Sequence, residues 1–67
     1  MSEADPNPNH EIVVARLMRQ LYGFAEGLGV DDFNLRVIVE RVIADMPLMP
    51  DDDRLARARN WMLIAAQ

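Results

Sequence analysis

The hydrophobic positions of residues 31–46 repeat at helical spacing and fall on two opposite sides of the expected helix. At 100° per residue, six side chains form one broad apolar arc, as is typical of a helix that faces a core. This arc consists of Leu35, Ile38, Val39, Val42, Ile43 and Met46. Phe33, Val37 and Ala44 form a narrower stripe on the other side. The pattern predicts a helix that is covered on both sides, and we assign Phe33, Val37 and Ala44 to a homodimer interface.

The many β-branched residues of this segment would also suit a strand. The length of the run and its apolar spacing favour a helix over residues 32–46, as do two opposite-charge pairs four residues apart. These pairs are Arg36 with Glu40 and Arg41 with Asp45. Asp31 or Asp32 is expected to cap the helix and Pro47 to end it.

A second amphipathic pattern predicts a helix over residues 9–28. Its apolar side chains cluster on one face, with positions that also fit a heptad seam. The cluster contains Val13, Leu17, Met18, Leu21, Phe24, Ala25 and Leu28. Gly29, or failing that Gly27, can adopt the left-handed conformation that ends a helix, and Val30 would add an apolar contact. Gly23 and Gly27 stand four residues apart, a spacing that permits close helix approach but weakens a helix.

The third helix is expected over residues 52–66, with Leu55, Ala58, Met62 and Ala65 on one face. Asp51, Asp52 and Asp53 supply a cap and an acidic first turn, which the positive end of a helix favours. Residues 61–66 are apolar nearly all round the helix and should be docked rather than frayed.

Together these elements predict an all-α fold: a small three-helix domain made of a helical hairpin and a C-terminal helix. Residues 1–8 read as a flexible lead-in and residues 9–67 as a single helical domain. A chain of 67 residues buries too little surface to be very stable by itself, and without cysteine it has no disulfides. Oligomerisation is the remedy that remains, so we expect a dimer.

The net charge of −4 argues against a partner with a phosphate backbone. All seven basic residues are arginine, which suits protein interfaces but also follows from a GC-rich coding genome. Neither a membrane segment nor a signal-peptide pattern is present, so the expected location is the cytoplasm.

Candidate catalytic and metal-ligating residues all have simpler explanations. The aspartates at 51–53 lack the glycine and the closing glutamate of a calcium-binding loop, and helix capping explains them. His10 lies near the apolar face of the first helix and has no nucleophile to orient, since the only serine is Ser2 in the lead-in. The sequence therefore predicts a protein that is not an enzyme and that uses no cofactor or metal.

The residues that remain suggest binding. Arg54 and Arg57 project to the same side of the third helix, with Trp61 between their directions, a composition found at interaction hot spots. Trp61 could equally belong to the core beneath the arginine stems, or the surface could hold phosphates. Leu48 and Met49, between two prolines, either enter a partner's groove or cover the protein's own core.

These features predict a small acidic regulator or adaptor, such as an inhibitor or a small subunit, that binds another protein through Arg54, Arg57, Trp61, Leu48 and Met49. The alternative is a nucleic-acid-binding transcriptional regulator that uses the arginines of the third helix, including Arg59. A helix-turn-helix reading is weakened by the three aspartates, which phosphates would repel from the start of the recognition helix.

Overall fold

The computed structural model describes residues 8–67, which form three helices and no strand. Helix α1 covers Pro8–Leu28, α2 covers Asp32–Asp45 and α3 covers Asp51–Ala65. The predicted all-α, three-helix domain is confirmed, and each predicted helix boundary lies within one residue of the observed one. Within this part of the chain, no helix combines the length and apolar character needed to cross a membrane.

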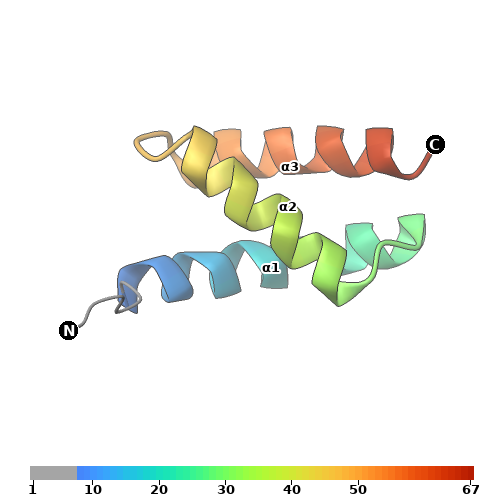
Figure 1. Ribbon diagram of the computed structural model, residues 1–67, viewed down its shortest axis with the longest axis horizontal. Helices are drawn as coiled ribbons and strands as arrows, with labels where there is room; N and C mark the ends of the chain where they lie inside the picture. The colour runs from blue at the N-terminus through green and yellow to red at the C-terminus, as the bar shows by residue number, and fades with distance from the viewer. Residues whose placement is uncertain (1–7) are drawn as a thin grey trace.

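The three helices pack so that each contacts both of the others. Figure 1 shows α1 and α3 running in the same general direction, with α2 returning obliquely between them. The molecule is elongated, with principal extents of 41 × 22 × 17 Å. This arrangement buries one face of every helix and leaves the opposite face of α2 available.

The core is built from one apolar stripe of each helix. Its fully or nearly fully buried members are Val14, Leu17, Leu21, Ala25, Leu35, Val39, Val42, Leu55, Ala58 and Met62. The broad arc predicted for α2 is confirmed, since three of its members are buried and the other three pack against the core. In contrast, Phe33 is 74% exposed and Val37 49% exposed. No part of residues 8–67 therefore covers the second stripe.

The connection between α1 and α2 follows the sequence signals closely. Gly29 has a positive φ of 77°, the left-handed conformation that favours glycine. Its N–H donates to the Glu26 carbonyl at 3.2 Å, and the Val30 N–H donates to the Ala25 carbonyl at 2.9 Å, which is a Schellman motif. The side chain of Asp31 then accepts the Asn34 N–H at 2.8 Å and caps α2, as predicted.

Helix α3 begins and ends differently from the prediction. Its N-cap is Pro50, in an extended conformation, and no side chain caps it. The three aspartates instead occupy the first turn, so the prediction that one of them is the cap is wrong. At the other end only Met62 is buried; Ile64 is 62% exposed, and Ala65 and Ala66 are exposed as well. The last turns of α3 pack against the core along one side and are exposed on the others, since α1 and α2 do not surround them.

The predicted flexible lead-in, residues 1–8, lies outside the described residues except for Pro8, which begins α1. Proline is well tolerated there, because the first N–H groups of a helix have no partner within it.

Candidate protein-binding surface

A shallow groove runs between α2 and α3 on the side where α2 is uncovered. It has a volume of about 480 Å³. We call it the α2–α3 groove; its lining residues are Val37, Ile38, Glu40, Arg41, Ala44 and Trp61. Two residues expected at a dimer interface, Val37 and Ala44, thus lie in the same hollow as Trp61, which was expected to contact a different protein.

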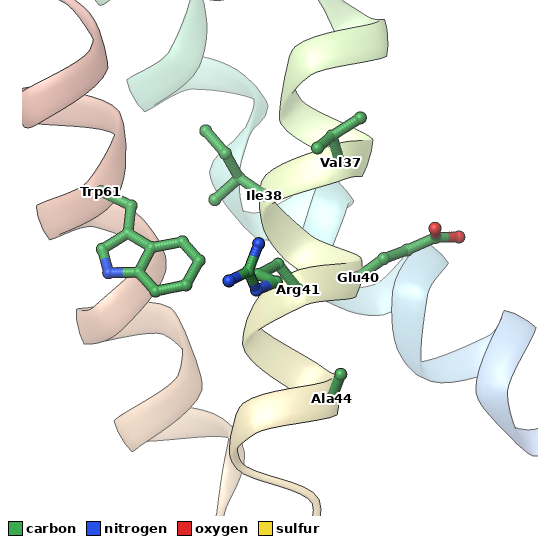
Figure 2. A pocket seen from close by; sticks show the side chains of 6 residues that line it. All are labelled: Val37, Ile38, Glu40, Arg41, Ala44 and Trp61. Carbon is green, nitrogen blue, oxygen red and sulfur yellow. The ribbon is translucent and has the colours of Figure 1, made fainter.

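Trp61 forms the α3 wall of this groove. Its side chain is half-buried and packs against the core. Trp61 therefore belongs partly to the core and partly to the surface, the two positions that the sequence left open for it. The guanidinium of Arg41 lies 5.8 Å from the centre of the indole ring, within range of a cation–π interaction. In Figure 2, Arg41 and Ile38 point toward Trp61, whereas Glu40 points away from it. The groove therefore has a largely apolar lining with one charge of each sign: Arg41 is directed toward Trp61 and Glu40 away from it.

A second, smaller hollow of about 250 Å³ lies at the end of the groove. It shares Val37 and Ile38 with the α2–α3 groove and extends toward Val30 and the last turn of α3. The concave apolar surface therefore continues along α2 toward the α1–α2 connection.

Arg54 is not part of this surface. Its side chain is buried, with only 9% of the residue exposed. Nε donates to the Met46 carbonyl at 3.0 Å and Nη2 to the Pro47 carbonyl at 2.6 Å, while Nη1 lies 3.4 Å from Asp51 Oδ1. The expectation that Arg54 joins Arg57 and Trp61 on an open face needs correction, because its guanidinium satisfies carbonyls at the end of α2.

The other predicted contact residues are exposed but lie outside the groove lining. Arg57 is exposed and makes no ion pair with residues 8–67. Leu48 is 95% exposed and Met49 43% exposed, so neither one is buried in the core of this protein. Phe33 begins the uncovered face of α2, one helical turn before Val37.

An ionic cluster lies on the flank of α2 that faces α1, and the sequence pattern did not predict it. Arg36 Nη2 lies 3.1 Å from Glu11 on α1 and 3.0 Å from Glu40 on α2, and His10 Nε2 lies 4.0 Å from Glu40. The hydrogen bond and the charge of Glu11 raise the pKa of Arg36. Only the pair within α2 could be read from its spacing, since Glu11 belongs to another helix.

His10, Glu11 and Glu40 offer ligand atoms within 4.8 Å of one another, a separation that a metal ion could bridge. However, both carboxylates already accept hydrogen bonds from the guanidinium of Arg36. Because that guanidinium already compensates their charge, we assign no cation to this cluster.

A second ion pair joins α1 to the start of α3. Arg16 Nε donates to Asp51 Oδ2 at 2.7 Å. This hydrogen bond holds the pKa of the Asp51 carboxyl below its usual value. The side chain of Asp51 thus links α3 to α1, in place of the helix-capping role expected of it.

Comparison with protein-family models, curated proteins and solved structures finds no match for this chain.

Proposed function

We propose that this protein is a small acidic regulator or adaptor, an inhibitor or a small subunit, that acts in the cytoplasm by binding another protein. In this proposal the protein is a homodimer through Phe33, Val37 and Ala44, and the other protein binds at Trp61, on the α3 side of the α2–α3 groove. The observation that carries the proposal is the groove itself, whose lining includes a half-buried tryptophan together with the exposed Val37 and Ala44. Tryptophan is enriched among the few residues that contribute most of the binding energy of protein interfaces.

The exposed apolar residues near the groove support the same reading. Phe33 and Ile64 are 74% and 62% exposed, and each lies one helical turn from a groove residue, Val37 and Trp61 respectively. Single exposed apolar side chains are common, but a run of them beside a concave apolar surface is typical of an interaction site.

The alternative, nucleic-acid binding through α3, has weaker support. With Arg54 buried, Arg57 and Arg59 remain exposed, and no ion pair within residues 8–67 neutralises either one. At the helical step they point about 160° apart, so they do not form one basic face. Fluorescence anisotropy with duplex DNA at low salt tests this alternative, and salt-sensitive binding would favour it over our proposal.

A pull-down from the native host tests the protein-binding proposal. The variants are Trp61→Ala, which removes the groove wall, and Val37→Asp, which adds a charge to its exposed lining. The matched control is Ile12→Ala, an apolar residue that is 59% exposed on α1 and does not line the groove. We expect the wild type and the control to capture the same partner, Trp61→Ala to lose that partner, and Val37→Asp to lose the homodimer in light scattering. Equal capture by the wild type and Trp61→Ala, each folded by circular dichroism, would refute the proposed contact with another protein, and a Val37→Asp variant that remains dimeric would refute the proposed dimer interface.

A further inference from the structure

We propose that the uncovered face of α2 binds a second copy of this chain in antiparallel orientation, with Phe33 against Ala44 of the partner subunit. This inference rests on the proposed homodimer and adds its orientation, register and contacts. Two observations carry it. They are the sizes of the exposed apolar residues along α2 and the position of the Arg36–Glu40 pair.

The sizes of the apolar residues suit an antiparallel pair. Phe33 is large and stands near the start of α2, whereas Ala44 is small and stands near its end. In a two-fold antiparallel contact, each Phe33 meets the partner subunit's Ala44, so a large side chain packs beside a small one at both ends. Parallel packing would instead place the two phenylalanines together and the two alanines together, which leaves a mismatch at each end.

This register also places opposite charges side by side. When Phe33 lies opposite the partner's Ala44, the two-fold axis passes midway between residues 38 and 39. Arg36 then lies about 1.5 Å along the helix axis from the level of the partner's Glu40. Both residues lie on the flank of α2 that faces α1, where Arg36 already contacts Glu11 at 3.1 Å. The two-fold keeps this flank on the same side in both copies, so each Glu40 lies between two arginines.

The groove supplies the remaining contact. The partner's Phe33 would lie beside Ala44, at the end of the hollow that Arg41 and Trp61 line. A helix of 14 residues is about 21 Å long, so the contact belongs to the small interfaces that form transient complexes. We therefore expect a dissociation constant in the micromolar range, about 10 µM or weaker.

Cysteine crosslinking tests the orientation directly, because the chain contains no cysteine of its own. Two full-length variants are made, Phe33→Cys and Ala44→Cys, and each is oxidised alone and after mixing at about 100 µM. In the proposed contact, residue 33 of one copy faces residue 44 of the other, within the span of a disulfide. The two copies of residue 33, or of residue 44, lie about 16 Å apart along the helix axis, which is too far for a disulfide. Ile12→Cys, on α1, reports random collision.

We expect the mixture to form a disulfide-linked dimer at least tenfold faster than either variant alone or the Ile12→Cys control. Rapid crosslinking of Phe33→Cys alone would overturn the orientation in favour of parallel packing. A mixture that reacts no faster than the Ile12→Cys control would overturn the contact.

Light scattering of the wild type over about 5 µM to 1 mM separates failure of this contact from failure of the homodimer. A concentration-dependent dimer that does not crosslink would retain the homodimer and reject this contact. A monomer throughout would reject both the homodimer and this contact.

Discussion

Among the charged residues of positions 8–67, Arg54 should contribute most to stability. We expect Arg54→Ala to lower the free energy of unfolding by about 2–3 kcal/mol. Hydrogen bonds from a charged donor contribute about 1.5–3 kcal/mol each when they are buried, and they are not additive. The Met46 carbonyl retains a 3.3 Å bond from the Met49 N–H, whereas the Pro47 carbonyl loses its 2.6 Å bond from Arg54. Because Pro47 is exposed, water can replace the hydrogen bond lost by its carbonyl, and the expected loss of stability lies toward the lower end of this range.

The consequence is large for a chain of this size. Typical stabilities of about 0.05–0.15 kcal/mol per residue give about 3–10 kcal/mol for 67 residues. At about 4–8 °C per kcal/mol, Arg54→Ala should lower Tm by about 8–24 °C. The stability of Arg54→Lys should lie between those of the wild type and Arg54→Ala, since an ammonium group cannot reproduce the two simultaneous hydrogen bonds of the guanidinium.

Urea unfolding followed by circular dichroism measures the effect, with the midpoint shifted and the slope unchanged. The matched control is Arg57→Ala, which removes an exposed arginine of the same helix and should change stability by less than about 0.5 kcal/mol. Equal urea midpoints for Arg54→Ala and Arg57→Ala would contradict this prediction, because the buried contacts of Arg54 would then contribute nothing measurable.

Three further predictions concern the glycines and the ion pair between α1 and α3. Gly23→Ala and Gly27→Ala should each raise stability by about 0.5–1 kcal/mol, since an added Cβ meets nothing within 4 Å at either position; a lower Tm would contradict this. Gly29→Ala should destabilise by about 1 kcal/mol because of its positive φ, and an unchanged urea midpoint would show that α1 can end without that conformation. The hydrogen bond from Arg16 lowers the pKa of Asp51 in the folded protein. The stability that this pair contributes is therefore fully present above the pKa of Asp51 in the unfolded chain, and it is lost as the pH falls through the pKa of Asp51 in the folded protein. Asp51→Asn should therefore reduce the loss of stability between about pH 5 and 2, and an unchanged acid titration of the melting temperature would count against it.

Local signals in the sequence determined most of the fold. The helical spacing of Leu35, Val39 and Val42 specified the buried face of α2, and Gly29 and Asp31 specified its entry. Each of these signals acts within a few residues, through backbone conformation or the alternation of apolar and polar faces, so no knowledge of distant segments was needed. The uncovered stripe that begins at Phe33 was also visible in the sequence, because it follows from the same spacing.

The roles of the charged residues and the composition of the groove depend on how the three helices are arranged in space. The sequence grouped Arg54 with Trp61 on one helix, but the fold turns Arg54 toward the carbonyls that end α2 and places Arg41 of another helix over Trp61. It also assigns Asp51 to Arg16, 35 residues away, in place of its own helix end. Long polar side chains have many acceptors within reach, and the one they contact depends on how the helices cross. That crossing is set by packing over the whole core, which no local pattern specifies.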